Sequence, residues 1–576
     1  MIQLDDITSP DDIKKLPVDE LPGLCASLRS ALTRKLAANG GHAGPNLGVV
    51  EATVALHRVF DAPADKLIFD VSHQTYIHKM LTGRMGAFTD PARYGEVTGY
   101  TCPRESEYDL FEVGHTSTSI SLAVGMAKAR DIEGGKENVV AFIGDASLGG
   151  GMALEALNLA PTLHSNIIVI LNDNQMSIAE NHGSLFDHLA RLRDSDGASP
   201  ENIFKALGYE YVYVREGNNV EALARAFEAA RGADHAVLIH INTMKGLGLP
   251  VAEAHKEKFH YSAPFDPKTG ELNGKRGESY FDIFALHMLH RMRADKRVVT
   301  MTAGTPGAFG FTPDRRKLAG DQFLDAGICE QAATAIAAGL AKGGSRPVFG
   351  VVASFIQRAY DQLSHDIAIN NLPAVVVDFY GTVWGMNDMT HLGFFDIAMV
   401  SNIPGIVFLA PANAEEYVAL LDKAIDQRDH PVFLRTPGGP VIHTDRPVNT
   451  DFFKYDVVEQ GEETAIIGAG SFFQIAAEAA AIMKTDGKRP TLINPRNLSH
   501  LDSATLDTLR GYRHVITLED GITDGGFGQK VAAYLGGSPV KVHVLGLQKK
   551  FLDRYHASEL LEANGLTPRK VASLAD

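Results

Sequence analysis

Cysteine is scarce in this chain, and the few cysteines are far apart. Of 576 residues only three are cysteine, namely Cys25, Cys102 and Cys329. They show neither the short spacing of a metal-binding motif nor the density of a disulfide framework. Because disulfides are rare in reducing compartments, we expect free thiols and a cytoplasmic protein.

Long apolar runs and basic blocks are also missing. No run approaches the roughly 18 apolar residues of a membrane-spanning helix, and residues 1–20 are acidic and lack the apolar stretch of a signal peptide. The formal net charge is −16, without a cluster of lysine and arginine, which argues against nucleic acid as a partner. The composition, 45% hydrophobic and 22% charged, is typical of a globular protein. The chain is too long for one core and suggests roughly three or four domains.

Two apolar runs mark the most informative stretch. Residues 139–143 and 167–171 each predict a short buried strand, with a helix over 152–159 between them. The first run leads into a tight turn at Asp145, and the second ends at Asn174, 29 positions later. Because parallel strands end at the same edge of a sheet, we expect these two side chains to meet there. A carboxylate and an amide oxygen suit Mg²⁺ or Ca²⁺, which prefer hard oxygen ligands.

A Gly-Asp turn by itself more often belongs to an ordinary βαβ unit than to a metal site. Here the carboxylate is followed by small turn residues and a helix start, an arrangement that suits a magnesium-bound diphosphate. The pair GDAS…NDNQM resembles the thiamine-diphosphate signature, which begins with GDG and ends with an asparagine. Ala146 stands where the signature has its second glycine, and this small residue still permits a close backbone approach.

Segments before residue 139 place histidines in loops next to predicted helices. His42 lies in the Gly/Pro loop GGHAGPNLG, and a lone loop histidine is more often structural than catalytic. His73 follows a predicted strand. Gly114, His115 and Thr116 precede a helix rich in small residues, a shape that can receive a diphosphate through backbone N–H groups.

A carboxylate stands at the start of a helix in the second half of the chain. Residues 323–341 predict a strand, a turn and an alanine-rich helix that begins near Glu330. The helix dipole alone favours an acidic residue at this position. The pattern therefore leaves a structural and a functional interpretation of Glu330 open.

Taken together, these motifs resemble the 1-deoxy-D-xylulose-5-phosphate synthase family, part of the transketolase group of thiamine-diphosphate enzymes. The resemblance covers nearly the whole chain, in the family's order: DVSHQ, HKMLTGR, ESEYD, VGHTSTSIS, GDAS, LNDNQMSIAEN, EQ, QRAYDQ and DGGFG. It implies a homodimer with a three-domain α/β, transketolase-like architecture. The implied parts are a diphosphate-binding domain (1–245), a linker carrying His260 (246–278), a pyrimidine-binding domain (279–440) and a C-terminal domain (451–576).

The resemblance also implies the cofactors, thiamine diphosphate and Mg²⁺, and the residues that bind them. The implied metal ligands are Asp145, Asn174 and the carbonyl of Met176. The residues implied to hold the cofactor are His73, Gly114, His115, Thr116, Ala146, Ser147, Asn174, Phe355 and Glu330. Phe355 would stack on the aminopyrimidine of the cofactor.

The implied catalytic residues are Glu330, His42, His260, His391 and Arg358. Glu330 would protonate the aminopyrimidine, a task that suits a carboxyl whose pKa is raised by burial. The three histidines would serve proton transfer and contacts with substrate hydroxyls.

The acceptor side departs from the family pattern. Where the family has residues that hold D-glyceraldehyde 3-phosphate, this chain has Val352, Phe379, Asn387 and Gly438, two of them in place of arginines. Further departures are Ala332 after the EQ pair, Leu249 in place of an aromatic, and a short segment over 182–207. Losing two phosphate-binding arginines should cost about 3–6 kcal/mol in kcat/KM, unless Arg358 or Arg435 compensates. These replacements suggest a less cationic, partly apolar pocket and a changed acceptor.

The predicted function is a thiamine-diphosphate-dependent carboligase. It would decarboxylate pyruvate, or a similar 2-oxo acid, and transfer the two-carbon unit to an aldehyde. Two alternatives stay open: a transketolase-like enzyme with a ketose donor, and a catalytically silent binding protein. The presence of Glu330 and the three histidines argues against the silent protein.

Overall fold

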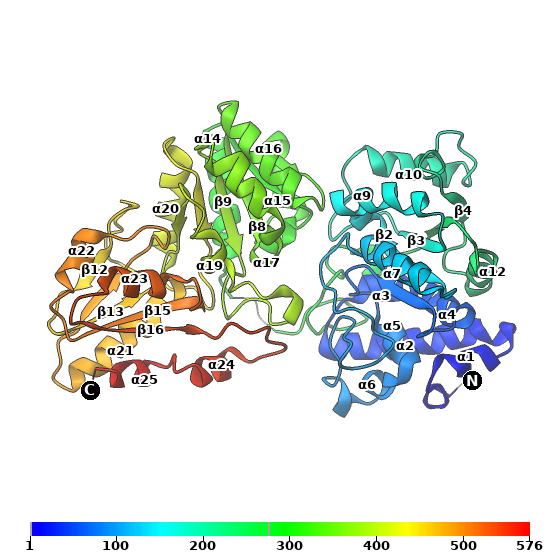
Figure 1. The fold of residues 1–576 in the computed structure, drawn as a ribbon, viewed down its shortest axis with the longest axis horizontal. Helices are drawn as coiled ribbons and strands as arrows, with labels where there is room; N and C mark the ends of the chain where they lie inside the picture. Colours follow the sequence, from blue (N-terminus) through cyan, green and yellow to red (C-terminus); the bar gives the residue numbers. More distant parts are fainter. Residues whose placement is uncertain (1–2, 275–276, 576) are drawn as a thin grey trace. The chain divides into compact units, whose positions relative to one another are not determined.

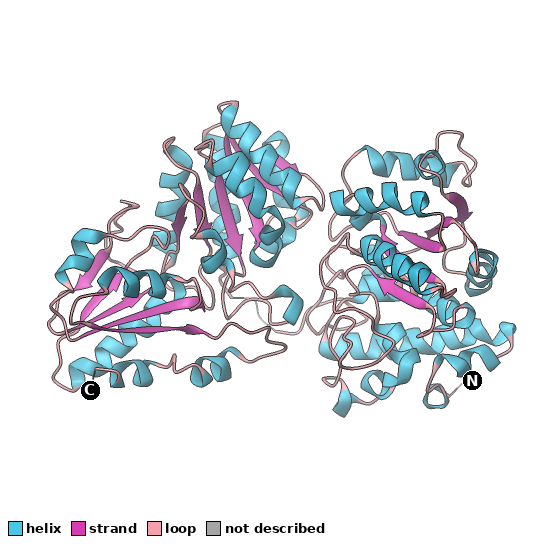
Figure 2. Cartoon of the chain, viewed as in Figure 1, coloured by secondary structure: helices cyan, strands magenta, loops and turns pink. Residues whose placement is uncertain are grey.

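The computed structural model describes residues 3–274 and 277–575, and the chain forms two compact units. The first unit consists of residues 1–276 with 327–329, and the second of residues 277–326 with 330–576. Three sheets, each covered by helices, lie within 66–242, 298–435 and 456–547 (Figures 1 and 2). The α/β class predicted from the sequence is confirmed, and each sheet falls inside one of the three expected domains. The domain boundaries themselves stay predictions.

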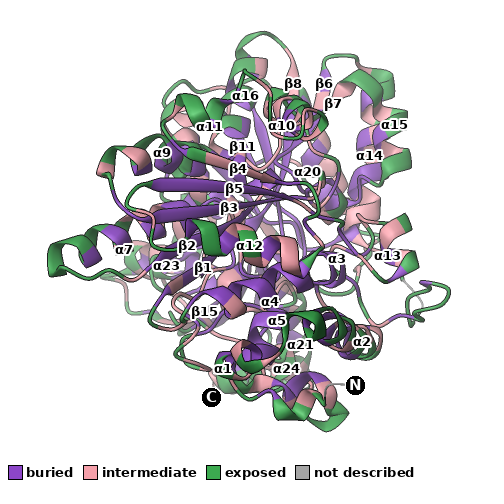
Figure 3. Ribbon diagram, turned by 90° about the vertical axis from the view of Figure 1, so that its right-hand side faces the viewer, coloured by how far each residue is buried: buried purple, intermediate pink, exposed green. Residues whose placement is uncertain are grey.

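The sheet of the first unit is parallel throughout, in the order β1-β2-β3-β5-β4. Its strands are β1 (Lys66–Phe69), β2 (Val139–Gly144), β3 (Ile167–Asp173), β4 (Glu210–Val214) and β5 (Ala236–Asn242). The strands predicted at 139–143 and 167–171 are thereby confirmed, as β2 and β3. Both faces of the sheet are covered, so these strands are continuous apolar runs that are buried along their length (Figure 3).

Successive strand residues point into two different cores. Val140 and Phe142 pack with α2, α4 and α12, whereas Ala141 and Ile143 pack with α7, α9 and α10 on the opposite face. The helices of this unit are α1 (Pro10–Lys15), α2 (Leu21–Asn39), α3 (Ala43–Leu47), α4 (Val50–Val59), α5 (Tyr76–Lys79), α6 (Gly86–Thr89), α7 (Ser119–Glu133), α8 (Asp145–Leu148), α9 (Gly151–Leu159), α10 (Ser184–Asp194), α11 (Ile203–Ala206), α12 (Val220–Ala230) and α13 (Pro250–Ala254).

The second unit contains two sheets. The parallel sheet in the order β10-β11-β9-β8-β6-β7 consists of β6 (Val298–Thr302), β7 (Phe323–Asp325), β8 (Arg346–Val352), β9 (Val375–Phe379), β10 (Val407–Leu409) and β11 (Val432–Arg435). Its helices are α14 (Tyr280–Ala294), α15 (Pro313–Ala319), α16 (Glu330–Lys342), α17 (Ala353–Ile356), α18 (Tyr360–Gln362), α19 (Asp396–Val400) and α20 (Ala414–Asp426).

The last sheet of the chain is mixed, because β12 runs antiparallel to β14. Its order is β12-β14-β13-β15-β16, from β12 (Asp456–Glu459), β13 (Thr464–Gly468), β14 (Thr491–Asn494), β15 (His514–Ile522) and β16 (Lys541–Leu547). The helices around it are α21 (Phe473–Thr485), α22 (Ser503–Thr508), α23 (Phe527–Leu535), α24 (Ala557–Ala563) and α25 (Pro568–Ser573). One hydrophobic core contains residues of both sheets of this unit, among them Phe349, Val376, Ile467 and Val515.

None of the helices in the described part of the chain has the length and apolar character needed to cross a membrane.

Candidate active site

The predicted metal ligands gather at the carboxyl edge of the first sheet. Asp145 begins α8 directly after β2, and Asn174 directly follows β3, the neighbouring parallel strand. The buried carboxylate of Asp145 accepts hydrogen bonds from the Ala146 N–H at 2.9 Å and from Asn181 Nδ2 at 3.0 Å. The Met176 N–H donates to Asn174 Oδ1 at 3.2 Å, which places Met176 in the same turn.

The donor set at this edge fits a hard divalent cation. Burial and the neighbouring Asp173 raise the pKa of Asp145 to about 8, and a cation beside the carboxylate would keep it ionised. The buried Oδ1 of Asn181 has no hydrogen-bond partner. One carboxylate, amide oxygens and a backbone carbonyl are the ligands that Mg²⁺ prefers. No cluster of three or more His, Cys, Asp or Glu side chains suited to a metal occurs among the described residues.

A buried aspartate organises the segment predicted to hold the diphosphate. Asp70, just after β1, accepts hydrogen bonds from the N–H groups of Ser117, Thr118 and Ser119 at 2.8, 2.9 and 3.0 Å. The Ser117 hydroxyl donates to the Ser147 carbonyl at 2.8 Å, which ties this segment to the turn after Asp145. Residues 114–116 thus lead directly into Ser117, which one hydrogen bond joins to Ser147 in α8. Asp70 thus accepts from the last two N–H groups before α7 and from the first N–H group of the helix, so an anion would have to use other N–H groups of this segment.

Three of the predicted histidines share one cluster. The ring centroids of His42 and His73 are 5.0 Å apart, those of His42 and His260 5.7 Å, and those of His73 and His260 5.2 Å. Burial lowers the pKa of His42 and of His260 well below the usual value, so both rings are neutral at pH 7. The buried Nδ1 of His42 has no hydrogen-bond partner. Neutral imidazoles of this kind can accept or donate a proton.

Lys245 is a functional candidate that the sequence analysis missed. It lies three residues beyond β5, and its buried Nζ donates to the Ser177 carbonyl at 2.5 Å and to His260 Nδ1 at 3.1 Å. Burial lowers the pKa of this amine to about 7. The signal in the sequence was a lysine followed by glycine directly after a buried strand, at the same sheet edge as Asp145.

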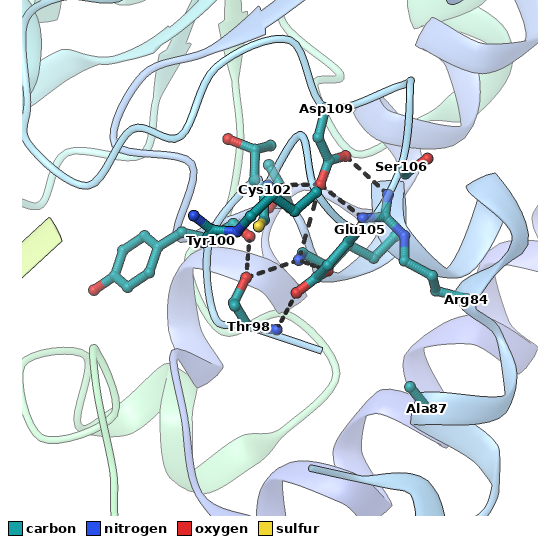
Figure 4. Close-up of polar contacts among 12 residues, drawn as sticks. Arg84, Ala87, Thr98, Tyr100, Cys102, Glu105, Ser106 and Asp109 are labelled. Carbon is teal, nitrogen blue, oxygen red and sulfur yellow. Dashed lines mark hydrogen bonds and ion pairs between the residues drawn. The ribbon is translucent and has the colours of Figure 1, made fainter. Parts of the chain in front are cut away.

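A buried ion-pair network explains two motifs that had no assigned role. Arg84 of HKMLTGR donates to both carboxylate oxygens of Asp109 of ESEYD, at 2.7 and 2.8 Å, and Lys79 donates to Glu105 at 2.5 Å (Figure 4). His78 completes the network with a 2.9 Å contact to Asp109. The two motifs therefore hold each other. They fix the loop over 98–113, which leads into the predicted diphosphate segment and whose Tyr100 ring packs 5.7 Å from His42.

The second unit contains the other predicted catalytic side chains. Glu330 is the first residue of α16, and burial raises the pKa of its carboxyl. Its buried Oε2 has no hydrogen-bond partner, and Nη1 of Arg358 lies 3.6 Å from it. Phe355 on α17 and His391 pack edge to face, with ring centroids 5.5 Å apart. A buried carboxyl with one unsatisfied oxygen suits an acid that must hold a proton for a ring nitrogen.

The interpretation of the acceptor replacements needs correction. Phe379 does not line a pocket, because it is fully buried in the core against Phe281, Phe284 and Phe309, with centroids 5.2–5.8 Å away. Val352 is also buried and pairs with Phe379 across β8 and β9.

Neither position 438 nor Arg435 is available to a phosphate. At Gly438 a Cβ atom would lie 2.1 Å from the Thr382 hydroxyl, so a larger side chain does not fit there. Arg435, one possible substitute for the missing arginines, is buried and donates to Asp396 at 2.6 and 3.0 Å and to the Asp520 carbonyl at 2.6 Å. The guanidinium of Arg435 therefore binds groups within the protein and does not face a phosphate.

The chain matches known protein families in three segments. Residues 278–440 match the family model for the transketolase pyrimidine-binding domain, and residues 454–571 match that for the transketolase C-terminal domain. These matches define the class, an α/β protein of the transketolase group. Residues 4–199 match the model for 1-deoxy-D-xylulose-5-phosphate synthase.

Relatives over the full length identify the family within that class. The chain is 39% identical to the 1-deoxy-D-xylulose-5-phosphate synthase of Symbiobacterium thermophilum, over 100% of this chain and 95% of that protein. It is 38% identical to the synthase of Caldanaerobacter subterraneus, over 99% and 98%. A transketolase structure from Pichia stipitis covers 97% of each chain at 17% identity, with a TM-score of 0.44. The chain belongs to the 1-deoxy-D-xylulose-5-phosphate synthase family.

Proposed function

We propose that this chain is a thiamine-diphosphate-dependent carboligase that decarboxylates pyruvate and transfers the two-carbon unit to an aldehyde. The balanced reaction takes one pyruvate anion, one aldehyde and one proton and releases one CO₂ and one α-hydroxy ketone. The proposal rests on the 39% and 38% sequence identity, over nearly the whole chain, with proteins named 1-deoxy-D-xylulose-5-phosphate synthase. The predicted metal ligands around Asp145 and the buried carboxyl of Glu330 support the proposal, because such an enzyme requires a metal site and a buried acid.

The cofactors of this family are thiamine diphosphate and Mg²⁺, and the residues at the first sheet fit them. Asp145, Asn174 and the Met176 carbonyl would hold the cation. His73, residues 114–116, Ala146 and Ser147 would line the diphosphate. When bound, thiamine diphosphate supplies the electron sink that makes decarboxylation of a 2-oxo acid possible.

The protein's own acid–base groups complete the chemistry. Glu330, with its raised pKa, would keep a proton available to the aminopyrimidine, and Phe355 would stack on that ring. His42 and His260 are neutral at pH 7 and would pass protons to and from substrate oxygens. Lys245 would orient His260 through the bond to its Nδ1. His391 and Arg358 would contact the substrate.

We also propose that the acceptor differs from D-glyceraldehyde 3-phosphate. Phe379 is buried in the core, Gly438 packs on Thr382, and Arg435 is committed to Asp396. None of the three positions is therefore arranged to bind a phosphate. An unpaired phosphate dianion would lose its hydration without full compensation.

We also propose an assembly and a compartment for this chain. The exposed apolar residues Met152, Leu154 and Leu159 on α9, and Ile336 on α16, favour contact with a second copy in a homodimer. The free thiols of Cys25, Cys102 and Cys329 favour a reducing cytoplasm. Light scattering after size-exclusion chromatography would give the assembly directly.

An aldehyde panel tests the function and its alternatives together. Purified protein with Mg²⁺ and thiamine diphosphate is given pyruvate and one aldehyde at a time, and both CO₂ and product mass are followed. Turnover with a ketose donor but not with pyruvate would make it transketolase-like, and no turnover with any donor would make it a silent protein. If D-glyceraldehyde 3-phosphate gives a kcat/KM of about 10⁴ M⁻¹s⁻¹ or more, and exceeds every other aldehyde, the changed-acceptor proposal is wrong.

A further inference from the structure

The acceptor segment, residues 380–395 between β9 and α19, carries Asn387 and His391. Its His391 ring packs against Phe355, which places one end of the segment beside the predicted aminopyrimidine site. The segment contains one 3-10 turn, Met389–His391, and is otherwise loop. Loops hold substrates well only where the surrounding structure fixes them. The contacts that fix this loop should therefore affect substrate binding.

The first anchor of the acceptor segment comes from the C-terminal sheet. The fully buried carboxylate of Asp520, on β15, accepts hydrogen bonds from the Thr382 hydroxyl at 2.6 Å and from the Val383 N–H at 3.0 Å. These are charge-assisted bonds, which are about twice as strong as neutral ones. Arg435 lies beside the same carboxylate, with Nη1 3.9 Å from Oδ2, and balances its charge.

The second anchor is the strap, residues 548–556, which follows β16 (Figure 1). Nδ2 of Asn387 donates to the Tyr555 carbonyl at 3.0 Å, and the Arg554 N–H donates to the Asn387 carbonyl at 2.8 Å. The Met389 N–H donates to Asp553 Oδ1 at 3.4 Å. The strap thus holds the side-chain amide and the backbone carbonyl of Asn387. It also holds the backbone N–H of Met389, two residues before His391.

The far end and the middle of the segment also rest on the C-terminal sheet. The Ile522 N–H, at the end of β15, donates to the Phe394 carbonyl at 3.2 Å. Trp384, the only tryptophan in the chain, packs edge to face on Phe472, with centroids 5.9 Å apart. The backbone N–H of Trp384 donates to the Thr382 hydroxyl at 3.3 Å. Residues near both ends and in the middle of the segment are therefore in contact with residues after 454.

We propose that the C-terminal domain determines acceptor binding, by holding the acceptor segment through Asp520 and the strap. Thr382 and Asp553 are then positioning residues that act on the aldehyde through the loop. This inference rests on the proposed function, which places the aldehyde at this segment. A displacement of about 1 Å in a substrate-positioning loop costs up to roughly 100-fold in rate. The metal ligand Asp145 on α8 and the acid Glu330 on α16 lie outside the segment, so pyruvate and cofactor binding should change much less than aldehyde binding.

Thr382→Val is the first test, because it removes the hydroxyl donor to Asp520 and keeps the side-chain shape. Its matched control is Thr517→Val. Thr517 is a buried threonine on β15, and its hydroxyl donates to the His543 carbonyl at 3.4 Å. We expect Thr382→Val to raise KM for the aldehyde about tenfold or more, since it removes a bond to a charged group. KM for pyruvate and Kd for thiamine diphosphate should stay within about twofold, and the control should change none of the three.

Asp553→Ala tests the strap, with Asp507→Ala as its control. Asp507 is an exposed aspartate of the same domain that lies on α22 and pairs with Arg510 at 2.8 Å. Trp384 gives a second readout that needs no turnover. Its fluorescence should shift in Thr382→Val and in Asp553→Ala, because the loop around the ring loosens, and stay unchanged in both controls.

The outcomes separate this inference from the proposed function. Unchanged aldehyde KM and unchanged Trp384 emission in both test variants would overturn it, and so would equal losses in pyruvate KM and cofactor Kd. If the wild-type protein turns over no pyruvate with any aldehyde, the proposed function fails. In that case the fluorescence comparison still decides whether the C-terminal domain holds the loop.

Discussion

At the residue scale, the account depends on buried titratable side chains whose surroundings set their protonation. Glu330 keeps one oxygen unsatisfied, with Arg358 3.6 Å away. We expect Glu330→Gln to lower kcat at least about 100-fold, because it removes the acid and keeps the shape. Thermal unfolding and Kd for Mg²⁺-thiamine diphosphate should change little, since the diphosphate groups lie elsewhere. Near-normal kcat in this variant would show that the assignment of the second unit is wrong.

Lys245 makes a prediction about pH at the same scale. Its pKa falls from 10.5 to about 7 on folding. Between these values the unfolded chain still holds a proton that the folded protein has lost, so stability should rise with pH. We expect urea unfolding of the cofactor-free protein to show this rise, contributing about 2 kcal/mol between pH 7 and 9. Lys245→Met should remove that contribution, and an identical pH profile for the variant would contradict the buried position of the amine.

At the scale of elements, the sequence pattern predicted the strands well and the contacts between loops poorly. β2 and β3 were recognisable because buried parallel strands are continuous apolar runs, and α16 because alanine and Glu330 mark its start. Phe379 was misinterpreted because alignment with a family motif gives a position but no side-chain direction. The cap that Asp70 provides to α7 was also missed, since its partners lie 47 to 49 residues away.

That cap gives a prediction for the helix α7. Asp70→Ala should lower stability by about 1–2 kcal/mol, as the loss of a helix cap usually does. It should also weaken thiamine diphosphate binding at least about tenfold, because the segment before the helix loses its support. Asp502→Ala is the control, since Asp502 caps α22 through the Thr505 N–H, in the C-terminal domain. If both variants lose stability and neither changes cofactor Kd, the cap has no part in cofactor binding.

At the scale of the whole molecule, the central claim is a metal-dependent thiamine-diphosphate carboligase. The most direct measurement is CO₂ release from pyruvate in the presence of the aldehyde panel, with and without Mg²⁺ and thiamine diphosphate, for the wild type and Asp145→Ala. We expect release only when both cofactors are present, and a product heavier than the aldehyde by one acetaldehyde unit. Asp145→Ala should bind thiamine diphosphate much more weakly, and added Mg²⁺ should rescue it only in part. Cofactor-independent release, no release from pyruvate at all, or unchanged cofactor affinity in Asp145→Ala would contradict the account.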